Sequence, residues 1–180
     1  NGKVYIKNMG PYNHSVEMYA NTAISVYDLS NYQWSDLTLD NVARGGNTSS
    51  KGALRSSYNM AFDPDSSEVF YVGSWFDGLH KFNGTKYVGN YNESNSNLAI
   101  QWCMMDGFSR FDADGNLWTL MVNNSKHDNT LLSCLPADKK IKDPAAVTAG
   151  DWVTYDVGAN LSFTCNLMVC QKSPYVFVIH

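Results

Sequence analysis

The sequence predicts an all-β fold, and three observations support that class. Short apolar runs bounded by turn residues recur along the chain, about thirteen of them. Aromatic residues reach 13%, while charged residues make up only 17%, below the usual ~25%. Helical periodicity is almost absent: an Asp cap followed by Pro at Asp143–Val147 predicts one short turn. These features favour strands joined by many turns.

The apolar runs give the expected strands in order. Most are rich in β-branched or aromatic residues, and most are followed by Gly, Asn, Asp, Ser or Pro, the residues that make turns. The expected strands cover residues 3–7, 23–28, 33–39, 58–62, 69–73, 78–82, 86–91, 102–111, 117–122, 130–135, 152–157, 163–169 and 175–179.

A repeat runs through these strands. The segment Phe62–Phe70 aligns with Phe111–Trp118, with one extra residue in the first turn, and each is followed by an apolar strand and then an aromatic one. The pair of strands at 23–28 and 33–37 repeats the same pattern near the start. Internal repeats of this size indicate an array of similar supersecondary units.

The spacing of the repeat predicts β-propeller blades. Tyr5, Phe70, Trp118 and Val176 occupy equivalent points, 65, 48 and 58 residues apart. A unit of ~40–50 residues with loop insertions is the period of a four-stranded antiparallel blade. We therefore expect one domain over residues 1–180, a partial propeller of about three to four blades. The blades are placed at approximately 1–40, 54–91, 100–157 and, incomplete, 158–180.

Both ends of the sequence lie in expected strands, which suggests a fragment of something longer. Lys3–Lys7 begins the chain almost at once, and Tyr175–Ile179 ends it. Unpaired strand edges recruit other chains. We therefore expect the first and last strands either to associate with another chain or to pair with each other.

Two segments carry a resemblance to a known repeat family. The residues from Met60 to Leu98, including Phe62-Asp63-Pro64-Asp65 and Gly78-Leu79, and those from Asp106 to Trp118 resemble the "two-component regulator propeller" repeats. They look most like PorZ-type propellers, accessory proteins of type IX secretion. The matching region is about residues 57–157, although the third blade reads Met121-Val122-Asn123-Asn124 where the pattern has Gly-Ser. The resemblance implies a protein of the periplasm or cell surface of a Gram-negative bacterium.

Charge and hydropathy exclude two classes of partner. The net charge is −4, the pI is near 5.4, and no basic run is longer than Lys139-Lys140. A nucleic-acid phosphate backbone needs a basic footprint, so we expect no nucleic-acid partner. No stretch approaches ~18 consecutive apolar residues, so we expect this segment not to insert into a membrane.

No residue pattern predicts a metal, a cofactor or a catalytic centre. Cys103, Cys134, Cys165 and Cys170 lack zinc spacing, and the last two are either bridged across a hairpin or free thiols. Asp112–Asn116 resembles the start of a calcium loop, but Gly stands fourth, and we interpret the segment as a turn capped by Asp.

The histidines and the acidic residues of the turns are not expected to form a functional site. None of His14, His80, His127 and His180 lies in a nucleophile motif, and His80 is expected at the surface or partly buried with a partner. The acids of the turns are expected to be solvated. They are Asp40, Asp63, Asp65, Asp112, Asp114, Asp128 and Asp138.

Three aromatic residues are the candidate binding residues. Trp75 and Phe76 follow Gly73-Ser74 between two strands of a blade, and Trp102 opens another strand. Exposed aromatics stack on sugars or anchor protein partners, whereas buried ones pack between blades. We therefore expect a non-enzymatic protein-binding scaffold, with a protein or glycan bound at one end of the propeller. The alternatives are a ligand-sensing periplasmic segment of a hybrid two-component sensor kinase and a carbohydrate-active propeller enzyme.

Overall fold

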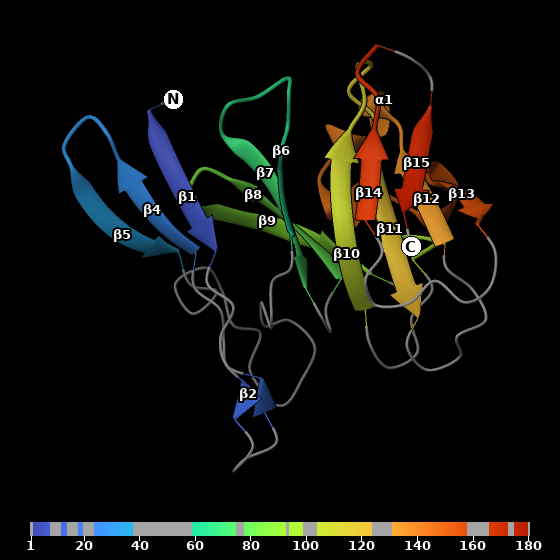
Figure 1. Cartoon of the computed structure of the whole chain (residues 1–180), viewed down its shortest axis with the longest axis horizontal. Coiled ribbons are helices and arrows are strands. Elements are labelled where there is room, and N and C mark those ends of the chain that lie inside the picture. The colour runs from blue at the N-terminus through green and yellow to red at the C-terminus, as the bar shows by residue number, and fades with distance from the viewer. Residues whose placement is uncertain are drawn as a thin grey trace.

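Antiparallel β-sheets make up almost all of the regular structure (Figure 1). The computed structural model describes residues 2–7, 12–13, 18–19, 24–37, 59–74, 78–92, 94–98, 104–123, 131–157, 166–172 and 175–179. Two of its sheets have four strands, and the only α-helix among these residues has a single turn. The predicted class, an all-β, propeller-like fold with four-stranded antiparallel sheets, is confirmed.

Four sheets follow one another in chain order, and we number them I to IV. Sheet I contains β1 (Lys3–Lys7), β4 (Ile24–Asp28) and β5 (Gln33–Leu37). Sheet II contains β6 (Asn59–Phe62), β7 (Val69–Ser74), β8 (Gly78–Asn83) and β9 (Lys86–Tyr91). Sheet III contains β10 (Met104–Phe111), β11 (Leu117–Asn123), β12 (Leu131–Leu135) and β13 (Val153–Asp156). Sheet IV contains β14 (Asn166–Val169) and β15 (Val176–Ile179).

Smaller elements lie in the connections. A short hairpin of β2 (Tyr12–Asn13) and β3 (Met18–Tyr19), which the sequence did not predict, follows β1. Between β12 and β13 come α1 (Ala137–Lys140) and the 3-10 turns η2 (Pro144–Ala146) and η3 (Ala149–Asp151). The turn predicted at Asp143 is η2: the Asp143 carboxylate accepts the Ala145 N–H at 3.0 Å.

Sheets I, II and III lie side by side in Figure 1, and each packs on the next through a shared cluster of side chains, as sheet III does with sheet IV. Alternation along the strands gives sheets II and III one face toward the preceding sheet and one toward the following sheet. The first two interfaces are apolar clusters whose buried members are each at most 8% exposed. Between sheets I and II the buried members are Ile24, Val26, Leu37, Phe70, Val72 and Phe82. Between sheets II and III they include Ala61, Tyr71, Leu79, Tyr91, Phe111, Leu117, Leu135 and Trp152.

The pairing of strands corrects the predicted alignment of the repeat. Phe62 lies opposite Phe70, whereas Phe111 lies opposite Leu117. The residue that corresponds to Phe70 is therefore Leu117, not Trp118, and the turn in sheet II is two residues longer rather than one. The sequence alignment was wrong because a turn can absorb an extra residue without changing the flanking apolar pattern.

The same shift is visible in the directions of the four residues predicted to be equivalent. Phe70 packs toward the preceding sheet and Val176 does so too, whereas Tyr5 and Trp118 pack toward the following sheet. A one-residue slip reverses the face of a strand residue. The four residues therefore do not all point toward the same side of their sheets.

The first and last strands belong to different sheets. β1 pairs with β4, and β15 pairs with β14. The expectation that the two strands pair with each other is therefore wrong, and association with another chain stays a prediction. Within the residues that the structure describes, no helix has the length and hydropathy needed to cross a membrane.

Candidate functional site

The three aromatic residues predicted to bind a partner lie outside the described residues. Trp75 and Phe76 fall between the end of β7 at Ser74 and the start of β8 at Gly78, and Trp102 falls shortly before β10. Their role as binding residues stays a prediction. The best-defined polar constellation in the described part of the chain is instead a set of charged side chains between sheets II and III.

Two related turns bring carboxylates to this interface. The β10–β11 turn is closed by Asp112, whose Oδ1 accepts the backbone N–H groups of Asp114 at 3.1 Å and Asn116 at 2.8 Å. Its Oδ2 accepts the Trp118 indole N–H at 2.7 Å and the Asn116 amide at 2.9 Å. Burial raises the pKa of Asp112, but the hydrogen bonds from Trp118 and Asn116 outweigh it and leave that pKa below its usual value. Gly115, at φ +76°, completes the turn.

The capped turn predicted at Asp112–Asn116 is therefore confirmed. A carboxylate that already accepts four donors has no lone pair directed at a cation. Among the described residues, no group of three or more His, Cys, Asp or Glu side chains is placed to hold a metal ion. The turn holds together by its own hydrogen bonds.

The β6–β7 turn is bonded to sheet III through a buried lysine. Lys140, the last residue of α1, has a side chain only 1% exposed. Its Nζ lies 2.5 Å from Asp63 Oδ1 and 2.9 Å from Asp65 Oδ2. The same amine lies 4.9 Å from the centroid of the Phe111 ring, over its face, which adds a cation–π contact. Asp63 was predicted to be solvated, and this is wrong: its side chain is 8% exposed.

A second lysine secures the segment that carries Lys140. Lys81, on β8, donates from Nζ to the carbonyl of Lys140 at 2.6 Å and of Lys142 at 2.9 Å. Burial lowers the pKa of Lys81, and the neighbouring Asp63 and Asp143 carboxylates oppose that change. The Tyr71 hydroxyl donates to the Lys140 carbonyl at 3.4 Å. We call Asp63, Asp65, Lys81 and Lys140 the charged seam.

The charged seam links sheets II and III through contacts of both lysines. Both lysines are engaged with oxygen atoms at the interface, and the turn that carries Gly115 sits against Asp65. Two more exposed lysines form ion pairs next to the seam: the Nζ atoms of Lys139 and Lys142 lie 3.9 Å and 3.8 Å from Asp151 Oδ1. Lys140 lies five residues after the strand that ends at Leu135, within the short basic run Lys139-Lys140, and no local pattern there indicates a buried partner.

Two further groups of the kind that enzymes use are buried. His80 is fully buried in the interface between sheets I and II, so the expectation that it is exposed or partnered is wrong. Among the described residues neither ring nitrogen finds a hydrogen-bond partner, and burial lowers the pKa of His80 to about 3. Burial raises the pKa of the Cys134 thiol to about 12. Cys134 and Cys170 are both free thiols, and Cys165 lies outside the described residues.

Comparison with known proteins finds a similar fold among the solved structures. No family model and no curated protein matches the chain. The structure of PorZ, described as an essential bacterial surface component of the type-IX secretion system of Porphyromonas gingivalis, superposes with a TM-score of 0.63 and 18% identity. The match covers 93% of this chain and 20% of that chain. At this identity the likeness shows the fold, and the chain spans about a fifth of PorZ.

Proposed function

We propose that this chain is a non-catalytic propeller segment of an exported bacterial protein and serves as a protein-binding scaffold. The observation that carries the proposal is the fold shared with PorZ over 93% of the chain. PorZ is a surface component of a secretion system. A related role for this chain would place it in the periplasm or at the cell surface, where it would bind another protein of the secretion machinery.

The described side chains support a scaffold more than an enzyme. Catalysis by acid–base or nucleophilic groups needs titratable side chains that reach a substrate. In the part of the chain that the structure describes, His80 and Cys134 are buried and Lys140 is engaged with Asp63. These groups contribute to packing between sheets, which leaves the ends of the sheets for recognition.

The proposed binding residues are Trp75, Phe76 and Trp102. Large aromatic side chains supply most of the binding free energy where they enter a partner's pocket. A variant in which all three become Ala removes that contribution. Ile141→Ala is the matched control, because Ile141 is an apolar residue that is 76% exposed and lies beside α1.

The test is to capture a binding partner with the purified chain and then to measure its affinity. The wild type is cross-linked to outer-membrane and periplasmic extracts of a bacterium with type IX secretion, and the captured protein is then purified and titrated directly. We expect saturable binding that is retained by Ile141→Ala and weakened about tenfold or more by the triple variant. Binding that is equal in all three proteins would contradict the assigned residues.

The same material separates the rival functions. A ligand-sensing propeller or a carbohydrate-active enzyme would bind a small molecule, and binding of a ligand to the folded state alone raises its thermal stability. A thermal-shift panel of mono- and oligosaccharides therefore accompanies the capture experiment. A saturable shift with one sugar and no protein partner would favour the sensor, and release of a cleaved sugar product would favour the enzyme.

A further inference from the structure

The charged seam contains an amine and a carboxylate that are in contact and shielded from water. Lys140 Nζ lies 2.5 Å from Asp63 Oδ1, and the two side chains are 1% and 8% exposed. Burying an ion pair costs free energy, because both charges lose their hydration. A reaction that replaces the two charges with a neutral group and releases water therefore relieves that cost. An amide bond between Lys140 Nζ and the Asp63 carboxyl carbon is such a product.

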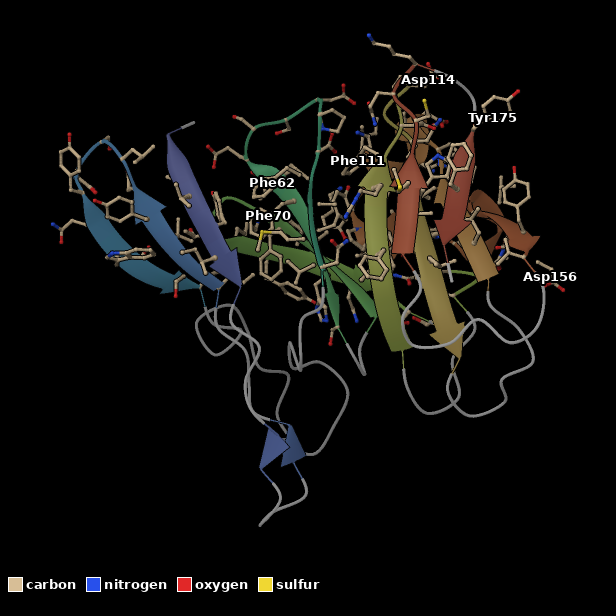
Figure 2. The ribbon with its side chains drawn as sticks, in the orientation of Figure 1. Phe62, Phe70, Phe111, Asp114, Asp156 and Tyr175 are labelled. Carbon is tan, nitrogen blue, oxygen red and sulfur yellow. The ribbon has the colours of Figure 1, made fainter. Side chains whose placement is uncertain are left out.

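Contacts of the backbone and the side chain hold the amine in place. Lys81 Nζ donates to the carbonyl of Lys140 at 2.6 Å, and the Tyr71 hydroxyl donates to the same carbonyl at 3.4 Å. The ring of Phe111, which Figure 2 shows on the sheet III side of the interface, lies 4.9 Å from Lys140 Nζ. Fixing two reacting groups in contact gives effective concentrations of about 10⁵ M or more. The seam thus supplies the orientation that an amine and a carboxylate lack in solution.

A second carboxylate is placed to move the protons. Asp65 Oδ2 lies 2.9 Å from Lys140 Nζ, so it can accept a proton from the ammonium group and return it to a departing oxygen atom. The backbone N–H of Asp65 donates to Asp63 Oδ1 at 2.9 Å. This donor stabilises the negative charge that Oδ1 gains when the amine attacks the carboxyl carbon. Asp65 therefore contributes both a proton acceptor and an oxyanion donor.

We propose that Lys140 and Asp63 join through an isopeptide bond, with Asp65 as the proton-transfer group. Once Asp65 has accepted a proton, the Nζ lone pair attacks Asp63 Cγ and forms the C–N bond. The Cγ–Oδ2 bond breaks, and Oδ2 leaves as water with two of the three protons that Nζ carried. One ammonium and one carboxylate thus give one amide and one water, without any further reactant. The reaction occurs once within the chain and does not depend on the proposed scaffold function.

An exposed ion pair next to the seam provides an internal comparison. Lys139 Nζ lies 3.2 Å from Asp138 Oδ2, but these side chains are 35% and 69% exposed. Hydration stabilises both charges there, and no desolvation cost favours their loss. We therefore expect this pair to remain ionic while the buried pair reacts.

The test is the mass of the purified full chain after reduction and denaturation. We expect a mass lower by one water molecule than the sequence requires, and a protease digest with a branched peptide that joins the segments around Asp63 and Lys140. Lys140→Arg and Asp63→Ala should each have the full mass of their sequences, whereas Lys139→Arg should lose a water as the wild type does. A wild type of full mass, without the branched peptide, would overturn the proposal.

The digest and one further variant locate the reaction. Asp114-Gly115 can also lose water, by attack of the Gly115 nitrogen on the Asp114 side chain to form a cyclic imide. Water lost there, with an unbranched Lys140 peptide, would contradict the isopeptide bond. Asp65→Asn keeps the backbone donor but removes the carboxylate, and its folding is checked by circular dichroism. After a pulse of synthesis it should form the bond about a hundredfold more slowly than the wild type, and an equal rate would exclude Asp65 as the proton-transfer group.

Discussion

Sheet II meets a different kind of neighbour on each of its two faces. Toward sheet I it presents Phe70, Val72 and Phe82. The rings of Phe70 and Phe82 stack with their centroids 5.1 Å apart. Toward sheet III it presents a similar apolar cluster, but with the charged seam at one end. Figure 2 shows Phe62 and Phe70 on the first side and Phe111 on the second. The same sheet thus packs on one face through apolar side chains and the His80 ring, and on the other through apolar side chains and buried charge.

Because of this difference, the two interfaces should lose stability in response to different substitutions. Apolar packing is non-directional and tolerates small shifts between sheets. A buried ion pair contributes stability only while its geometry holds, and it is costly when one partner is removed. We therefore expect the sheet II–III interface to be sensitive to single charge changes, and the sheet I–II interface to be sensitive to burial of a new charge at His80.

The largest effect is expected from Lys140→Met. The substitution leaves the Asp63 carboxylate buried without its cation, which costs about 3–5 kcal/mol of unfolding free energy. Urea denaturation measures the change. Lys139→Met is the control, because Lys139 is partly exposed and its pairs with Asp138 and Asp151 are worth about 1 kcal/mol or less.

A second substitution tests whether the unpaired Asp63 carboxylate causes the loss of stability. Asp63→Asn in the Lys140→Met background removes the stranded charge, so part of the lost stability should return. Equal stabilities of Lys140→Met and Lys139→Met would show that the buried pair contributes nothing beyond an exposed one.

The next effect is a loss of stability in acid that comes from His80. Its pKa is about 3 in the folded chain because of burial, against the usual ~6.5 when unfolded. Above pH ~6.5 both states are neutral at this ring, so titration has no effect. As the pH falls below that value the unfolded state binds a proton that the folded state refuses, and stability falls until the folded pKa is reached. At pH ~4.5 the loss is about 2–3 kcal/mol.

The measurement compares the wild type with His80→Leu across this pH range. The variant keeps every carboxylate of the chain, so the difference between the two curves isolates His80. Its stability should decline less steeply between pH ~6.5 and ~4. Parallel curves would mean that His80 gains a proton acceptor or water in the folded state.

A smaller effect is expected where the two turns touch. Gly115 has φ +76°, and a Cβ built there would lie 2.8 Å from Asp65 Oδ2. Gly115→Ala should therefore cost about 1–2 kcal/mol, from backbone strain and displacement of the partly exposed Asp65 carboxylate. Gly150→Ala is the control, because its Cβ would meet nothing nearer than Thr148 Oγ1 at 3.8 Å. Thermal unfolding of the two variants distinguishes them, and equal midpoints would contradict the strain argument.

Local patterns in the sequence predicted local structure well. The strand at Lys3–Lys7 has the predicted bounds, the turn at Pro144 has its predicted cap, and Asp112 closes its turn as expected. Each of these depends on residues a few positions apart. The one-residue error between Phe70 and Trp118 arose where a turn of variable length separates two strands, because alternation along one strand carries no information about its neighbour.

The candidate site depended on contacts between distant residues, which the sequence could not supply. Lys140 pairs with Asp63, which lies 77 positions earlier in the chain. The local sequence around either residue does not indicate which residue it contacts. The burial of His80 likewise depends on sheet I, more than forty positions away. Trp75 and Phe76 were predicted as binding residues from a connection and Trp102 from the start of a strand, and the binding experiment tests their role.

The smallest effect is expected from calcium, which should leave the chain unchanged. The Asp112–Asn116 turn has acidic residues at the spacing of a calcium loop, yet the Asp112 oxygens accept N–H groups from Asp114, Asn116 and Trp118. A calcium ion takes six to eight oxygen ligands and would have to displace these donors, including the partly buried indole N–H of Trp118. Isothermal titration with millimolar calcium should show no saturable heat, and the unfolding midpoint should not move. A one-site isotherm that Asp114→Ala abolishes would show that the turn can reopen to bind the ion.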